Sequence, residues 1–270
     1  MNGSGREIVS AATLDGLCCE LWIDRARLLA CVRGQGALHL EPVNHGDPEL
    51  SPVICELWQV THGRSVLGGF DPHRLVEQWA GAAGGWLGLG ADTGRALNRL
   101  FSLGPYRECL LAVPNVSLEL GGERHALVLG MITDNPIALS IDRSFGYGYR
   151  KRLGRFRFED RRRFEVVVER EVAVSGEIID DDEPGSLEPD RAWLDDYWAQ
   201  PLLGRLGPRD FRRSWLERRS SAPEARASCV GATVVVSPAL GLGVDGVRGR
   251  AVSFSNVPSR ISLPRRVAGG

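Results

Sequence analysis

The stretch ECLLAVPNVSLELGGERHALVLGMIT, residues 108–133, consists of two apolar runs joined by a short connection that contains two glycines. The runs 108–120 and 125–133 are rich in Leu, Val and Ile, a composition typical of buried strands. Gly121 and Gly122 allow the backbone conformations that a tight turn between neighbouring strands requires. The stretch therefore predicts an antiparallel β-hairpin.

Similar apolar runs occur on both sides of this hairpin and are separated by Gly, Pro and Asn residues, which are typical of turns. These runs cover residues 19–24, 52–60, 155–160, 162–178, 227–238 and 249–264. We expect a β-rich α+β fold, with an antiparallel β-barrel or sheet as its core and a few peripheral helices.

Two segments interrupt the strand pattern. Residues 71–103 predict two short helices around a glycine-rich bend, with Asp71 and Pro72 at the first helix N-terminus. The segment from Asp180 to about Ala227 begins as an acidic loop and continues as a Trp- and Arg-rich stretch that we expect to be helical. We therefore expect one domain, residues 1–270, with helical insertions at about 61–103 and 180–228.

Composition narrows the class of protein. A hydrophobic content of 43% and a charged content of 25% are ordinary for a soluble globular protein. The net charge of −1 disfavours a globally basic nucleic-acid binder. The sequence has no apolar run that could span a membrane and no signal peptide, which predicts a cytoplasmic protein. The six cysteines and five histidines show no metal-ligand spacing, so we expect no metal site.

Lys151, within FGYGYRKRLGRF (145–156), is the only lysine of the chain, since all other members of the 33 Lys and Arg residues are arginine. One interpretation is a lysine left on a solvated strand. The other is a position that needs an amine able to lose its proton and attack a carbonyl group, which a guanidinium cannot do. In a strand the neighbours Arg150 and Arg152 would point to the opposite face, so burial would have to activate the amine.

The segment RKRLGRFRFEDRRR (150–163) is the densest charge cluster. As a nucleic-acid patch, it would place Arg155, Arg157 and Arg161–Arg163 on one exposed face. As a pair of half-exposed strands, it would alternate charged and apolar residues and balance the arginines with nearby glutamates. The period-two alternation of RFRFED favours the second interpretation.

The segment DNPIALSIDRSFGYGYRKRLG (134–154) resembles the lysine-bearing region of acetoacetate decarboxylases. In that family the first lysine of a Lys-Lys pair forms a Schiff base with the substrate ketone, and this position falls on Lys151. The second lysine falls on Arg152, which keeps a positive charge that disfavours protonation of the neighbouring amine. The resemblance thus implies that Lys151 is a nucleophile.

Three further blocks are similar to the same family, and together the resemblance covers about residues 19–60, 104–178 and 229–266. The stretch GPYRECLLAVPNVSLELGGERHALVLGMITDN puts a family active-site glutamate on Glu108. SPVICELWQV puts a second one on Glu56, although a glutamate in an apolar strand could equally face solvent or form an ion pair. SNVPSRISLPRR resembles the closing strand of the family.

The sequence also departs from the family pattern. The family arginine near the N-terminus has no counterpart in SAATLDGLCC, and the family glutamate before the lysine is lost within Asp142-Arg143-Ser144. A cation that orients the substrate carboxylate would have to come from elsewhere. The candidates for lining or binding the substrate are Arg143, Arg107, Arg150, Tyr106 and Tyr149.

Taken together, the resemblance implies a Schiff-base-forming lyase that acts on a small keto acid, by decarboxylation or by aldol-type chemistry. Glu108 and Glu56 would move protons or orient the substrate. The protonated imine is itself the electron sink, so no cofactor is implied. The expected partners are the keto acid and further copies of the chain. The alternatives are a catalytically inactive small-molecule-binding barrel and a basic-patch nucleic-acid binder.

Overall fold

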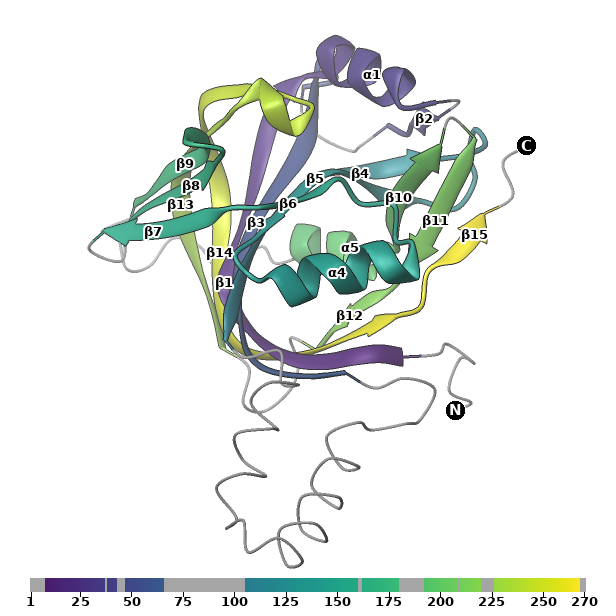
Figure 1. Cartoon of the computed structure of the whole chain (residues 1–270). Coiled ribbons are helices and arrows are strands. Elements are labelled where there is room, and N and C mark those ends of the chain that lie inside the picture. Colours follow the sequence, from purple (N-terminus) through teal and green to yellow (C-terminus); the bar gives the residue numbers. More distant parts are fainter. Residues whose placement is uncertain are drawn as a thin grey trace, which may run out of the picture.

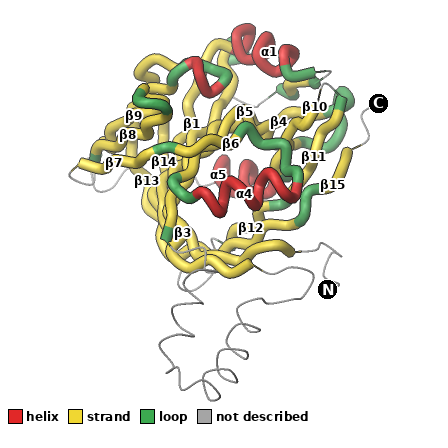
Figure 2. Tube along the Cα trace, in the orientation of Figure 1, coloured by secondary structure: helices red, strands yellow, loops and turns green. Residues whose placement is uncertain are grey.

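The structure is a computed structural model that describes residues 8–36, 38–42, 47–65, 105–159, 162–179, 192–207, 209–219 and 226–267. The helices expected within 71–103 and the acidic loop expected at 180–191 lie outside the described residues. Strands make up most of the described chain (Figure 2). The β-rich fold with few helices is therefore confirmed.

The centre of the fold is a row of long antiparallel strands (Figure 1). Strand β1 (Ile8–Asp24) lies between β3 (Leu50–Ser65) and β14 (Val244–Ser262). On its other side β3 pairs with β4 (Tyr106–Ser117), which pairs with β5 (His125–Thr133). The hairpin predicted from residues 108–133 is thus confirmed as β4 and β5.

The sheet continues beyond β14 and beyond β5, and its described strands form one fifteen-stranded sheet that does not close into a barrel. Beyond β14 follow β13 (Arg226–Val236), β9 (Glu171–Ile179), β8 (Arg163–Val168) and β7 (Arg155–Glu159). Beyond β5 follow β10 (Leu202–Gly207), β11 (Asp210–Ser214) and β15 (Arg265–Val267). Three short strands pair off this path: β2 (His39–Leu40), β6 (Lys151–Leu153) and β12 (Leu216–Arg218).

The described helices are α1 (Arg25–Gly34), α4 (Pro136–Phe145) and α5 (Ala192–Ala199), with a 3₁₀ turn at Pro238–Leu240. Figure 1 places α1 at one end of the molecule and α4 near its centre. None of the described helices is long and apolar enough to cross a membrane.

The central strands are buried on both faces because successive side chains point into two different apolar layers. On β3, Cys55 and Leu57 belong to one layer. Ile54 and Trp58 belong to the other, together with the described residues of α5 that are buried. The candidate site described below is enclosed within this second layer.

Two segments differ from the sequence prediction. The run 162–178 is a hairpin, β8 and β9, because Glu169 and Arg170 both have positive φ values, 50° and 75°, and reverse the chain. In the stretch expected to be helical after residue 191, α5 is the only helix among the residues that the structure describes. Pro201 cannot extend a helix hydrogen-bond ladder, and the chain then pairs in parallel with β5, Leu202 opposite Ala126. The sheet is therefore mixed rather than purely antiparallel.

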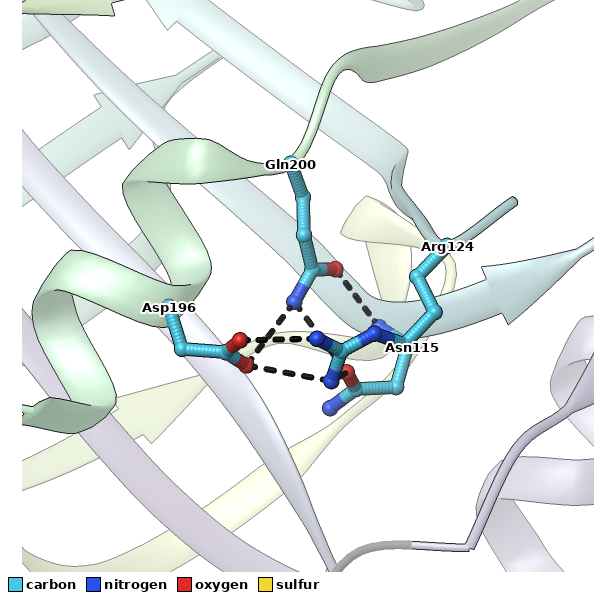
Figure 3. Close-up of polar contacts among 4 residues, drawn as sticks. All are labelled: Asn115, Arg124, Asp196 and Gln200. Carbon is cyan, nitrogen blue, oxygen red and sulfur yellow. Dashed lines mark hydrogen bonds and ion pairs between the residues drawn. The ribbon is translucent and has the colours of Figure 1, made fainter.

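A polar network holds α5 against the bulged end of β4 (Figure 3). Gln200 accepts a hydrogen bond from the backbone N–H of Asn115 at 2.8 Å and donates one to the Asn115 side chain at 3.1 Å. Arg124 forms an ion pair with Asp196 at 2.9 Å and also donates a hydrogen bond to the Asn115 side chain at 3.1 Å. This network fixes the position of α5, whose aromatic side chains contact the buried glutamate of β3.

Gly204 keeps β10 close to the segment that precedes Lys151. A Cβ atom at this position would lie 2.0 Å from the carbonyl oxygen of Tyr147. We expect Gly204→Ala to lower the free energy of unfolding by about 1–3 kcal/mol, because the clash is with backbone and cannot relax locally. Urea unfolding measures this change. Gly34→Ala is the control, since nothing lies within 4 Å of that added atom, and equal losses in both variants would contradict the prediction.

Candidate active site

Helix α4 carries one wall of the site, and its ends are defined by local sequence. Asn135 caps the N-terminus by accepting hydrogen bonds from the N–H groups of Ile137 and Ala138 at 2.8 and 3.1 Å. Pro136 occupies the first turn, where a missing N–H has no cost. Gly146 ends the helix in the left-handed conformation, φ 66°, which favours glycine.

The chain after α4 brings Lys151 to the edge of β5. Gly148 also has a positive φ, 77°, and its carbonyl oxygen accepts a hydrogen bond from the N–H of Arg205 at 2.8 Å. Strand β6 then runs parallel to β5, with Lys151 opposite Met131. Only 8% of the Lys151 side chain is exposed, whereas Arg150 and Arg152 are exposed, as the alternation of a strand predicts.

Lys151 lines a cavity of about 90 Å³ between α4 and the curved sheet. The wall is mostly apolar and includes Ala12, Leu14, Val60, Met131, Leu202 and Ile261. Its larger polar and aromatic members are Trp58, Tyr106, Glu108, Asp142, Tyr147, Tyr149 and Lys151. An engineered cavity of about 150 Å³ accepts benzene, so this space suits a ligand of only a few non-hydrogen atoms.

Glu108 is the ion-pair partner of Lys151. One carboxylate oxygen contacts the lysine Nζ, and 8% of the Glu108 side chain is exposed. The other oxygen accepts a hydrogen bond from Trp58 Nε1 at 3.2 Å. Trp58 and Glu108 lie directly opposite each other on β3 and β4, so the sheet register itself fixes this contact. The structure thus brings together two residues that the sequence analysis named separately.

Asp142 is a second carboxyl group in the cavity, and the sequence analysis did not name it as a site residue. It is 6% exposed and lies one helical turn after Ala138, which lines the same wall. Burial raises the pKa of Asp142 to about 7, the charge of Lys151 lowers it, and that of Glu108 raises it further. The signals in the sequence were the helical spacing of Asp142 from Ala138 and its place in the segment 134–154, which resembles the lysine-bearing region of acetoacetate decarboxylases.

The tyrosines form a neutral part of the wall. The rings of Tyr147 and Tyr149 stack with centroids 5.5 Å apart. Tyr147 donates a hydrogen bond to the carbonyl oxygen of Ser262 at 3.0 Å. The hydroxyl groups of Tyr149 and Ser214 form a hydrogen bond with each other. Burial raises the pKa of Tyr106, Tyr147 and Tyr149, so all three stay protonated near neutral pH.

Glu56 does not line this cavity. It is fully buried and forms an ion pair with Arg218 at 2.6 Å. It also accepts hydrogen bonds from Tyr197 at 3.0 Å and Trp198 at 3.1 Å. The Arg218 guanidinium lies 5.6 Å from the ring of Trp58, which connects this cluster to Glu108. The geometry therefore matches the ion-pair interpretation of Glu56 that the sequence left open.

The arginines named as substrate-binding candidates also lie outside the cavity wall. Arg143 and Arg150 are exposed. The Arg107 side chain is 40% exposed, lies 3.9 Å from Asp134 and packs over the ring of Phe158. Within the described residues, the cavity wall contains no arginine.

The exposed arginines of the β7–β9 region are partly balanced by acidic neighbours. Arg157 lies 3.7 Å from Glu165, and Arg163 lies 3.3 Å from Glu177. These acidic partners match the expected balance of the arginines by nearby glutamates. The alternation expected from RFRFED is not found, because β7 ends the described sheet and its Phe158 is 52% exposed, which leaves only Phe156 partly buried. Arg161 lies outside the described residues. No group of three metal-ligating side chains occurs among the residues that the structure describes.

No protein-family model matches the sequence, and no curated protein matches it. Solved structures do match. The acetoacetate decarboxylase of Legionella pneumophila aligns with a TM-score of 0.60 at 9% identity, over 99% of this chain and 91% of that one. The enduracididine biosynthesis enzyme MppR aligns with a TM-score of 0.54 at 13% identity, over 97% and 89%. An acetoacetate decarboxylase-like enzyme from Sphingomonas wittichii RW1 gives 0.52 at 13% identity, over 98% and 94%.

These alignments establish the fold of the chain. This chain has the fold of acetoacetate decarboxylase and of acetoacetate decarboxylase-like enzymes, as its sequence resemblance predicted. The solved structures of MppR include one with pyruvate and one with the condensation product of pyruvate and imidazole 4-carboxaldehyde.

Proposed function

We propose that this protein is a Schiff-base-forming carbon–carbon lyase that acts on a small keto acid, with Lys151 as its nucleophile. The observation that carries the proposal is the placement of the only lysine of the chain. It lies almost fully buried in a mostly apolar cavity, paired with a carboxylate that is held by Trp58. A lysine on a solvated strand would need neither the cavity nor the partner.

Glu108 has the position required to prepare the nucleophile. Transfer of a proton from the Lys151 ammonium to Glu108 leaves a neutral amine, which can attack the carbonyl carbon of the substrate. The carbonyl oxygen leaves as water, and a protonated imine remains on Lys151. The small volume of the cavity limits the competing access of bulk water once a ligand is bound.

The protonated imine is the intermediate from which either of two reactions can proceed. In decarboxylation, the bond to the departing carboxylate breaks, its electron pair moves toward the imine nitrogen, and the resulting enamine takes up a proton on carbon. In the aldol-type reaction, the substrate loses a proton next to the imine and the enamine carbon attacks an aldehyde. Hydrolysis frees Lys151 in both cases.

The solved structures with the same fold support this proposal by analogy of fold. One neighbour is an acetoacetate decarboxylase, and MppR has been solved with pyruvate and with a pyruvate condensation product. The mostly apolar wall around a single amine supports a compact substrate. It leaves both decarboxylation and condensation open as reactions.

We expect Glu108→Gln to lower kcat about 100-fold or more, because glutamine retains a hydrogen-bond acceptor for Trp58 but cannot take the lysine proton. The assay is steady-state turnover of a keto acid substrate. Glu171→Gln, an exposed position on β9, is the matched control and should stay within twofold. Turnover of Glu108→Gln at the level of this control would contradict the role given to Glu108.

The test of the reaction itself uses two substrate mixtures. Acetoacetate reports decarboxylation through release of carbon dioxide, and pyruvate with an aromatic aldehyde reports condensation through absorbance of the conjugated product. Saturable turnover in either mixture supports the lyase and identifies the bond that is broken or made. Binding of keto acids without any turnover would instead indicate a binding protein of this fold.

A further inference from the structure

We propose that Asp142 is a catalytic residue that removes and returns the proton on the substrate carbon next to the imine. Glu108 exchanges protons with the nitrogen of Lys151. The inference rests on the proposed imine chemistry at Lys151. It divides the acid–base work between the two carboxyl groups of one cavity.

The two carboxyl groups differ in how they are held. Both oxygens of Glu108 have partners, since one contacts Lys151 and the other accepts from Trp58. Within the described residues, the carboxyl group of Asp142 takes part in no hydrogen bond or ion pair, although the residue is only 6% exposed and lines the cavity. The carboxyl oxygens of Asp142 are open to the cavity rather than enclosed by protein atoms. A ligand in the cavity can therefore contact them directly.

The surroundings of Asp142 suit a group that exchanges protons near neutral pH. Three charged residues act electrostatically on Asp142: Lys151 on β6, Glu108 on β4 and Arg143 on α4 itself. Tyr147 and Tyr149 follow α4 and interact electrostatically with it. Burial raises the pKa of Asp142 to about 7, so both its acid and its base forms are present at that pH. General acid–base catalysis is most efficient under this condition.

The proposed step starts from pyruvate bound to Lys151 as a protonated imine. The carboxylate of Asp142 takes a proton from the methyl carbon, and the electron pair of that C–H bond forms a C=C bond. The former C=N electron pair moves to the nitrogen, which gives a neutral enamine and protonated Asp142. In heavy water Asp142 exchanges its proton with solvent and returns deuterium to the carbon.

The test compares two measurements on each protein, with pyruvate as the probe. Borohydride trapping reports imine formation at Lys151, and proton NMR in heavy water reports exchange of the methyl protons. We expect Asp142→Asn to trap pyruvate within about twofold of the unmodified protein, while its exchange rate falls about 100-fold. Ser144→Ala, an exposed position on the same helix, is the control and should alter neither measurement.

The pH profile of exchange separates a catalytic role of Asp142 from a structural one. Exchange by the unmodified protein should rise as pH increases through about 7, because the carboxylate form of Asp142 is the base. Asp142→Asn should lose this inflection. An unmodified protein that traps pyruvate without exchange, or a variant that keeps both rate and inflection, would overturn the inference alone. Failure of the unmodified protein to trap any keto acid would overturn the proposed function as well.

Discussion

Lys151→Arg is expected to abolish catalysis, with turnover of any keto acid substrate falling about 1,000-fold or more. Arginine keeps the positive charge beside Glu108 and can still form the ion pair. A guanidinium stays protonated and cannot form an imine, so the variant removes the nucleophile while leaving the charge of the cavity unchanged. Steady-state turnover of acetoacetate, or of pyruvate with an aldehyde, measures the loss.

The control for this variant is Arg155→Lys, at an exposed position on β7. This change adds a lysine to the protein but places it on the surface, so turnover should stay within twofold of the unmodified protein. Thermal unfolding of both variants shows whether either has lost its fold. A Lys151→Arg protein that is folded and still active would remove Lys151 from the mechanism.

Arg218→Met is expected to have the largest effect on stability, lowering the free energy of unfolding by about 3–5 kcal/mol. The Arg218 side chain is 2% exposed and pairs with a Glu56 that is fully buried. Methionine fills much of the arginine volume, so the main cost is the carboxylate left behind in an apolar layer. Hydrogen bonds from Tyr197 and Trp198 only partly offset that cost.

The double variant Glu56→Leu with Arg218→Met separates charge from packing. Removing both charges should recover most of the loss, because well-packed apolar residues replace buried ion pairs at little cost. Arg260→Met, an exposed position on β14, is the control and should change stability by about 0.5 kcal/mol or less. Urea unfolding measures all of them. A single variant as stable as the control would contradict a structural role for the pair.

The fold was predictable where local pattern and tertiary pairing agree. The hairpin of β4 and β5 follows from two apolar runs with a glycine turn between them, and both strands are buried as such runs predict. The segment after α5 was not predictable in this way. Its Trp- and Arg-rich composition suits a helix. In the structure β10 instead pairs with β11, which follows it in sequence, and at Leu202 and Leu203 with β5, which lies far away in sequence.

In the candidate site, too, some residues could be predicted from local sequence and others could not. Lys151 and Glu108 could be named from the sequence, since one is the only lysine and the other lies in a strand similar to that of a known family. The pairing of Glu56 with Arg218 spans 162 residues, and no local spacing indicates it. Asp142 required knowing which face of α4 meets the sheet. Position in space, rather than residue type, decided these assignments.

Borohydride trapping with peptide mapping shows directly whether Lys151 forms an imine, with acetoacetate and pyruvate as probes. We expect a reduced adduct on Lys151 of the unmodified protein and of Arg155→Lys, with no adduct on the exposed lysine of the latter. The double variant Lys151→Arg with Arg155→Lys keeps one lysine and the same charge, and it should give no lysine adduct. An adduct on the exposed lysine at the same yield, or none on Lys151 across a panel of small keto acids, would show that Lys151 is not the nucleophile of an imine-forming enzyme.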